Sequence, residues 1–538
     1  MMGVKAVTTP KENAMREFLS HHGSKIASVL SGFDRLVFRG SLRALRHSGM
    51  RMFLDSAGVR LLDFGSYAER TTKKVKSAAL AEAEAMGRPV VYLDSPRASK
   101  EEVARALLVE HPLAQPGLIC ALTAVEPCMR FEYHRSQIPS ERGLRLGRSK
   151  CLHVYKYYQH PTFGFMHMRL QTYFPFDVQI CMNGREWLAR QLSARGSEFE
   201  RADNCFPRLA DPDLAQRLLD EQLRTAWPVT LDMLLKTLNP LHDEVFRAWP
   251  MTYWWVAYQT EWATDLAFKD AAALKALYPA LVRHAVDHFK SPDVLRFLGK
   301  IERQSWKQDI VSSFKERPEG VRVKHWLNGN SLKMYDKAGN VLRVETTIGN
   351  PKDFSVFRPR REDEGGEGLT EEEGKKLVWR NMRKSVADLH RRAELSQRAN
   401  ERYLDALSGV DDTTPCSHLF DAVSRPVAEE GRRFRALRLS DSADLSLLAA
   451  ISRGEFVISG FRNRDLRQFL YSPPKTKEDE RRLSSKMSRQ LRLLRAHGII
   501  RKIQKTHRYQ ITTRGRLLTA ALNATREASI KDLLQKAA

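Results

Sequence analysis

The stretch NSLKMYDKAGNVLRVETT, residues 330–347, limits the local structure of this chain more than any other segment. Apolar and polar residues alternate on both sides of the tripeptide AGN, and this period of two is typical of β-strands joined by a tight turn. In the second strand Arg343 and Glu345 point to one face, while Leu342 and Val344 point to the other. The polar face is therefore either solvated surface or the floor of a polar site.

The chain as a whole is predicted to be an α+β protein with several domains, because 538 residues exceed what one hydrophobic core supports. Strand–helix alternation predicts an N-terminal α/β domain over residues 1–130. Residues 131–357 are interpreted as a central mixed or antiparallel β-sheet with helices. Residues 358–376 are charged and glycine-rich, which predicts a linker, and residues 377–410 are predicted to form a basic helix.

The C-terminal segment, residues 440–538, has the order helix, helix, helix, hairpin, helix, which is typical of a winged helix-turn-helix. Residues 481–520 contain twelve Lys or Arg and no Asp or Glu. Gly498 is well placed to end the third helix. A recognition helix needs an apolar side for docking and a basic side for DNA. The predicted DNA-contacting residues are Arg482, Lys486, Arg489, Arg492 and Arg495 on that helix, and Lys505, His507 and Arg508 at the hairpin tip.

The net charge points to a polyanionic partner. The chain has 89 Lys and Arg against 64 Asp and Glu, a formal charge of +25. Such an excess favours nucleic acid, whose bound counterions are released when phosphates are neutralised. In the central region we expect Arg322, Lys324, Lys333 and Arg343 to form a basic sheet surface that binds it. No run of 18 apolar residues occurs and the N-terminus lacks the apolar run of a signal peptide, so a cytoplasmic protein without membrane association is expected.

Three carboxylates stand out against this positive charge. Glu261 and Asp265 are four residues apart, a spacing that places both on one face of either a helix or a strand. Glu345 lies in the basic sheet surface. Converging carboxylates are what a divalent cation requires, so Mg²⁺ or Mn²⁺ is the hypothesis. The alternative is that these carboxylates pair with neighbouring basic residues.

Two short motifs carry a resemblance to a known family. YDK at residues 335–337 and LRVE at 342–345 resemble the YDK and R-x-E signature of rolling-circle replication initiators from plasmids and filamentous phages. The resemblance implies a sheet on which a divalent cation and a tyrosine nick one DNA strand, with a covalent 5′-phosphotyrosine product. It implies Glu345, Asp265 and Glu261 as metal ligands and Tyr403, in the basic helix, as the nucleophile.

Two further resemblances bear on the C-terminus and on the whole chain. LRLLRAHGIIRKI and HRYQIT resemble the winged-helix domains of MarR-type regulators. Motifs such as FDRLVFRG and NSLKMYDK resemble an uncharacterised bacterial family. The leading function is therefore DNA processing of the replication-initiator or mobile-element kind, with metal-dependent nicking or strand transfer. The alternatives are an RNA-binding protein in a ribonucleoprotein and a non-catalytic winged-helix regulator.

Overall fold

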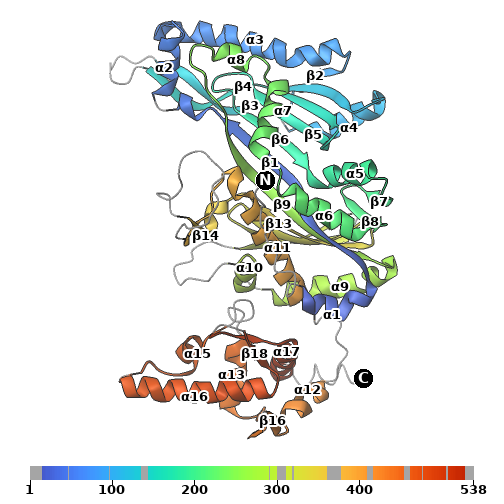
Figure 1. The fold of residues 1–538 in the computed structure, drawn as a ribbon, viewed down its shortest axis with the longest axis vertical. Helices are drawn as coiled ribbons and strands as arrows, with labels where there is room; N and C mark the ends of the chain where they lie inside the picture. The colour runs from blue at the N-terminus through green and yellow to red at the C-terminus, as the bar shows by residue number, and fades with distance from the viewer. Residues whose placement is uncertain are drawn as a thin grey trace, which may run out of the picture.

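A computed structural model describes most of the chain, and one large sheet forms its body (Figure 1). The described residues are 15–46, 48–95, 97–134, 143–289, 291–299, 310–317, 320–359, 377–408, 416–429, 431–452, 461–474, 476–503 and 507–527. The sheet has eleven strands. Neighbouring strands pair antiparallel from β10 through to β3, and β2 is parallel to β3, which confirms the predicted mixed central sheet.

The strands follow one another across the sheet in an order far from that of the sequence. From one edge to the other they are β10 (Val311–Arg317), β11 (Gly320–Leu327), β12 (Asn330–Lys337), β13 (Val341–Ile348), β9 (Trp254–Phe268), β1 (Ile26–Ser41), β6 (Val178–Asn183), β5 (Gly164–Gln171), β4 (Gly143–His160), β3 (Gly117–His134) and β2 (Val90–Tyr92). The long strands β1 and β9 lie side by side at the centre (Figure 1).

The two halves of the sheet have the same strand order. In one half the meander β3, β4, β5, β6 returns so that β6 pairs with β1. In the other half β10, β11, β12, β13 returns so that β13 pairs with β9. Because β1 and β9 pair antiparallel, the halves are related topologically by an approximate twofold axis between these strands. The sequence contains no repeat that predicts this relation.

The predicted division at residue 130 is wrong as a boundary between two sheets. Strands β1, β2 and β3 of the predicted N-terminal domain belong to the same sheet as β4 to β13. Residue 130 itself lies inside β3, which pairs along its whole length with β4. The sequence could not show this because the β1–β9 pairing joins segments more than 200 residues apart.

One face of the sheet, here called the helical face, is covered by helices. The strands present Met168, Leu342 and Val344 to it. The helices that pack on these apolar residues are α1 (Arg16–His22), α2 (Gly49–Ser56), α3 (Phe64–Ala85), α7 (Trp227–Leu238), α9 (Ala271–His288), α10 (Ser291–Phe297) and α11 (Leu389–Ala406), with the short α8 (His242–Val245) beside them. This burial removes the helical face from water and supplies most of the core.

The opposite face, here called the polar face, is covered only in part by the described residues. Helix α4 (Lys100–Glu110) packs near the β3 edge, where Ala104 contacts a small apolar cluster. Helices α5 (Gly184–Ala194) and α6 (Pro212–Gln222) cover Leu30, and the hairpin of β7 (Phe199–Ala202) and β8 (Cys205–Leu209) lies beside them. Polar side chains occupy the remaining surface.

The segment after the sheet differs from its prediction. Residues 377–381, expected to start a basic helix, form strand β15 (Leu377–Asn381), which pairs with β14 (Ser355–Pro359). Helix α11 begins only at Leu389. Residues 360–376, most of the predicted linker, lie outside the described residues.

The C-terminal elements have a hydrophobic core of their own. They are α12 (Cys416–Val423), β16 (Val427–Glu429), β17 (Arg432–Phe434), α13 (Ser442–Ser452), α15 (Asn463–Leu470), α16 (Lys477–Ala496), β18 (Ile500–Lys502), β19 (Tyr509–Ile511) and α17 (Thr513–Glu527). Gly498 ends α16 as predicted: its φ is +69°, its N–H donates to Arg495 O at 2.8 Å, and the N–H of Ile499 donates to Leu494 O at 2.9 Å. In the described part of the chain, no helix is long and apolar enough to cross a membrane.

Candidate functional site

The polar side of the 330–347 hairpin is a buried site, not a solvated surface. Lys333 pairs with Glu345 across β12 and β13, and Tyr335 pairs with Arg343, so these four side chains share the polar face. Arg343 has no exposed surface and Glu345 is 2% exposed. A buried charge needs a partner, so the surrounding residues decide what this site can do.

Asp265 is the main partner of Arg343. Arg343 Nε donates to Asp265 Oδ1 at 2.6 Å and Nη2 donates to Oδ2 at 2.8 Å, a bidentate ion pair. Arg185 Nη2 adds a second contact to Asp265 Oδ2 at 3.1 Å. Burial alone would raise the pKa of Asp265, but the charges of Arg343 and Arg185 hold it below its usual range. Both oxygens of Asp265, which was expected to bind a metal, are held by arginines, and Asp265 is not one of the carboxylates that converge.

A different set of three carboxylates does converge. Asp34 on β1, Glu261 on β9 and Glu345 on β13 each offer an oxygen within 4.8 Å of the others. Burial raises the pKa of Asp34, and burial with the charge of Glu345 raises the pKa of Glu261. Two of the three predicted ligands thus belong to this group, and Asp34 was missed. The clue to Asp34 in the sequence is that it is a single acidic residue within the largely apolar segment that forms β1.

Cations and neutral donors already contact this acidic group. Lys333 Nζ lies 2.5 Å from Glu345 Oε1, and the Tyr335 hydroxyl donates to Oε2 at 3.0 Å. Burial would raise the pKa of Glu345, but Lys333 holds it below its usual range. Asn204 Nδ2 lies 2.7 Å from each oxygen of Asp34. The group has the oxygen chemistry of a Mg²⁺ or Mn²⁺ site, and its charge is partly balanced by protein groups.

Tyr403 does not reach this group. It lies on α11 and packs in the core of the helical face, with its ring 5.0 Å from Phe289 and 5.2 Å from Phe297. The side chain has no exposed surface, and burial raises its pKa well above the usual value. The predicted nucleophile therefore lies on the wrong face of the sheet. Tyr335 is the tyrosine that the structure brings to the carboxylates.

Of the four basic residues predicted to form a surface on the central sheet, Arg322, Lys324 and Lys333 are half-buried on the polar face, whereas Arg343 is fully buried and paired with Asp265. Lys324 lies directly opposite Lys333 across β11 and β12, and Lys315 lies directly opposite Arg322 across β10 and β11. Burial and the charges of Lys333 and Arg322 lower the pKa of Lys324. Like charges directly opposite each other destabilise a sheet. Two such pairs on neighbouring strands are stabilised when an anion lies across them.

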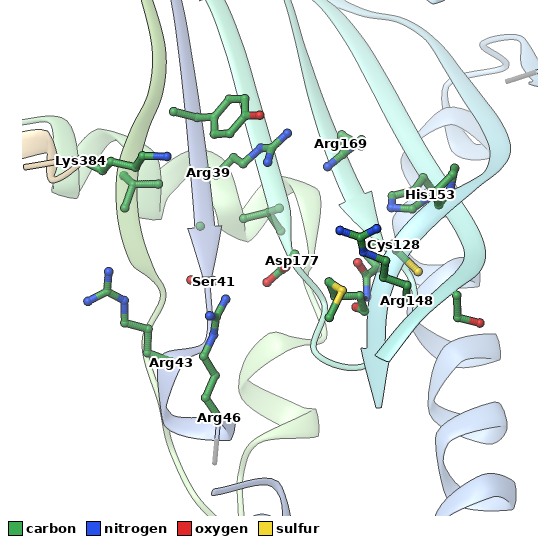
Figure 2. Close-up of a pocket in the computed structure, with 18 residues that line it drawn as sticks. Arg39, Ser41, Arg43, Arg46, Cys128, Arg148, His153, Arg169, Asp177 and Lys384 are labelled. Carbon is green, nitrogen blue, oxygen red and sulfur yellow. The ribbon is translucent and has the colours of Figure 1, made fainter. Parts of the chain in front are cut away.

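The same face continues across the other half of the sheet, where no pattern in the sequence predicts it. Arg35 lies opposite Glu261, and Arg39 pairs with Gln179, which in turn pairs with Arg169. Arg35 is exposed, and Arg39 and Arg169 are half-buried. These arginines are scattered over more than 130 residues of sequence, and only the strand order brings them together. Arg39 and Arg169 line a pocket together with Arg148 and other cations (Figure 2).

The predicted cations of the C-terminal segment are mostly exposed. Arg482, Lys486, Arg489 and Arg492 lie on the exposed side of α16, opposite the buried Met487 and Leu491. Arg495 is half-buried, 3.5 Å from Glu429 Oε1. His507 is exposed and Arg508 is half-buried, while Lys505 lies outside the described residues. Helix α16 therefore has one apolar side and one basic side.

Comparison of the chain with models of known protein families, with curated proteins and with solved structures finds no match in any of the three. The resemblances to rolling-circle initiators and to MarR-type regulators remain predictions.

Proposed function

We propose that this protein binds nucleic acid, with DNA as the first candidate, along the polar face of its sheet. The observation that carries the proposal is the pair of like-charge contacts, Lys324 with Lys333 and Lys315 with Arg322. Glu345 balances the charge of Lys333. Lys315, Arg322 and Lys324 have no carboxylate oxygen within 4.0 Å in the part of the chain that the structure describes, so a polyanion that lies across them neutralises their charge and releases its own counterions.

The extent of the basic face favours a polymer over a small anion. Strand β11, which carries Arg322 and Lys324, and strand β5, which carries Arg169, are six strand intervals apart in the sheet. At roughly 4.8 Å per interval this is about 29 Å. A nucleic-acid backbone presents regularly spaced phosphates over such a length. The formal charge of +25 acts in the same direction.

The C-terminal segment is proposed to be a winged helix-turn-helix that recognises DNA. Helix α16 would enter the major groove with Arg482, Lys486, Arg489 and Arg492, and the β18–β19 hairpin would be the wing. The support is the element order, the separate core and the exposed basic side of α16.

The test is fluorescence anisotropy on the full chain with duplex DNA, single-stranded DNA, single-stranded RNA and a structured RNA at several salt concentrations. We expect the tightest binding to DNA, with affinity falling steeply as salt rises. Lys324→Gln together with Arg322→Gln should weaken binding at least tenfold. Lys76→Gln, an exposed cation on α3, is the matched control and should change nothing. Preference for the structured RNA would replace the proposal by a ribonucleoprotein, and binding carried by the C-terminal segment alone would indicate a regulator.

Metal-dependent nicking of a DNA strand is a second candidate function. The observation that favours it is the convergence of Asp34, Glu261 and Glu345 on the basic face. These carboxylates would hold Mg²⁺ or Mn²⁺, which would stabilise the charge that develops on an attacked phosphodiester. Lys333 lies beside Glu345 and would contact the phosphate.

The test combines a binding and a cleavage readout. Mn²⁺ should raise the melting temperature of the wild type and not that of Glu261→Gln, and single-stranded DNA should be nicked by the wild type only. A protein that neither responds to Mn²⁺ nor nicks DNA with either ion has no such activity.

A further inference from the structure

The polar face contains a pocket, and Arg169 of the proposed nucleic-acid-binding face is one of its lining residues. Its volume is about 760 Å³ and it lies in the half of the sheet formed by β1 and β3 to β6 (Figure 2). This volume is within the range of small-molecule sites, roughly 300–1,000 Å³. The acidic group of Asp34, Glu261 and Glu345 does not line it.

The lining of the pocket is strongly cationic. Six of the lining side chains are basic, and Asp177 is the one carboxylate among them. Burial raises the pKa of Asp177, although the nearby arginines act in the opposite direction. The six cations are Arg39, Arg43, Arg46, Arg148, Arg169 and Lys384.

The cations surround the pocket from several directions. Figure 2 shows Lys384 on one side and Arg148 on the other, with Arg39 and Arg169 between them. Arg39 is fixed in place: its guanidinium lies 3.4 Å from the centre of the Tyr258 ring, and Nε donates to Gln179 Oε1 at 3.2 Å. Neither partner is charged, so these two contacts hold the guanidinium in place without forming an ion pair.

Most of these cations form no ion pair within the described residues, and Asp177 supplies a single carboxylate against six cations. Arg169 Nη1 lies 3.6 Å from Glu126 Oε2. The other five cations, Arg39, Arg43, Arg46, Arg148 and Lys384, have no carboxylate oxygen within 4.0 Å in the part of the chain that the structure describes. Five cations without an ion pair around one pocket repel one another, and an anion of matching charge removes that repulsion.

The number of cations and the size of the pocket indicate how much negative charge a matching ligand carries. A single phosphate carries up to two negative charges and matches fewer than half of the cations. A chain of phosphates concentrates three or four charges within the pocket, and arginine binds such groups through two parallel N–H···O contacts. Ser41, Ser149 and Gln171 add neutral hydrogen-bonding groups to the wall.

We propose that this pocket binds a polyphosphate group, carried either by a nucleoside triphosphate or by the 5′-triphosphorylated end of a nucleic acid. The inference goes beyond the proposed function, because a protein that binds only internal phosphates of a nucleic acid has no need of such a pocket.

The test measures direct binding to the full chain by isothermal titration calorimetry. The probes are inorganic triphosphate, ATP, AMP and inorganic phosphate, followed by one oligonucleotide with either a 5′-triphosphate or a 5′-hydroxyl. We expect triphosphate and ATP to bind at least tenfold tighter than phosphate and AMP. The variant Arg46→Gln with Arg148→Gln, here called the rim variant, removes two exposed cations that line the pocket. It should weaken triphosphate binding at least tenfold. Lys76→Gln is again the control, and circular dichroism verifies the fold of each variant.

The outcomes separate the two sources of the group and the two proposals. A 5′-triphosphorylated oligonucleotide that binds tenfold tighter than both ATP and the 5′-hydroxyl form identifies a nucleic-acid end. Equal affinity for ATP identifies a free nucleotide. Triphosphate binding no tighter than phosphate binding overturns the inference, as does triphosphate binding that the rim variant leaves unchanged. If the rim variant instead weakens 5′-hydroxyl and 5′-triphosphate forms equally, the pocket is part of the nucleic-acid face and only the proposed function survives.

Discussion

The substitution Asp265→Asn separates a structural role of this carboxylate from a catalytic one. Asp265 makes a bidentate pair with Arg343, at 2.6 and 2.8 Å, and contacts Arg185 at 3.1 Å. Both arginines have no exposed surface and Asp265 is 4% exposed. Asparagine keeps the shape and removes the charge, so two buried guanidinium groups lose their main anion.

The expected cost follows from the contacts that remain. Removing one partner of a buried ion pair typically costs about 3–5 kcal/mol, because an uncompensated charge stays in the interior. Arg343 retains Asp34, whose Oδ2 lies 3.3 Å from Nη1. We therefore expect a loss of about 3 kcal/mol in the free energy of unfolding at pH 7.

The lowered pKa of Asp265 determines how its contribution to stability changes with pH. The folded protein lowers the pKa of Asp265, so its contribution is fully present above the pKa of an unfolded aspartate, about 4, and is lost as the pH falls through the lower folded value. The difference in the free energy of unfolding between wild type and variant should be constant from pH 7 to about pH 5 and should narrow below about pH 4.

Urea unfolding followed by tryptophan fluorescence measures this loss in the sheet alone. All nine tryptophans precede residue 380, so the C-terminal segment contributes no signal. The midpoint should fall while the slope stays unchanged. Glu394→Gln is the control, because its pair with Arg398 is more than half exposed on both sides and should cost less than about 0.5 kcal/mol. A loss below about 1 kcal/mol for Asp265→Asn would show that the buried-pair reasoning is wrong.

Three further variants test other parts of the structure. Arg482→Gln with Arg489→Gln should weaken DNA binding in anisotropy titrations. The slope of log affinity against log salt should become shallower by about 2, one for each lost phosphate contact, and an unchanged slope would show that α16 does not contact DNA. Tyr403→Phe should leave nucleic-acid binding and any nicking intact, with at most about 1 kcal/mol lost in urea unfolding, because its hydroxyl makes one long contact to His325 at 3.4 Å; a loss of nicking would reinstate Tyr403 as a nucleophile. Glu261→Gln should be as stable as the wild type at pH 7 or more stable, since the fold raises the pKa of Glu261 and thus disfavours its charged form; lower stability in urea unfolding at pH 7 would contradict this.

The local patterns were predictable from the sequence because they depend on neighbouring residues. The alternation around Arg343 and Glu345 defined a strand with one polar face, and the spacing of Met487 and Leu491 defined an amphipathic helix. Each pattern depends only on residues that lie close together in the sequence. Glu261 and Asp265 were placed correctly on one face for the same reason.

The partners of these residues were not predictable because they depend on which strands become neighbours. The sequence predicts Arg343 as part of a nucleic-acid surface, yet in the structure it donates hydrogen bonds to Asp265 and to Asp34, which is more than 300 residues away. Tyr403 lies in a basic helix, but the sequence does not tell which face of the sheet that helix covers. Arg39 and Arg169 meet only because β6 lies between β1 and β5.

The pocket and the basic residues of β11 lie on the same polar face, and the distance between them makes a length prediction. Arg169 on β5 and Lys324 on β11 are six strand intervals apart, about 29 Å at roughly 4.8 Å each. A stacked strand rises about 3.4 Å per nucleotide, so about nine nucleotides cover this distance. If a 5′-triphosphorylated strand occupies both places, oligonucleotides shorter than about nine nucleotides should bind through the pocket alone and be insensitive to Lys324→Gln, whereas longer ones should gain affinity and become sensitive to it. Anisotropy titrations of a length series measure the transition. Affinity that rises smoothly from the shortest strand onward, with the same dependence on Lys324 throughout, would show that the two places do not bind one strand.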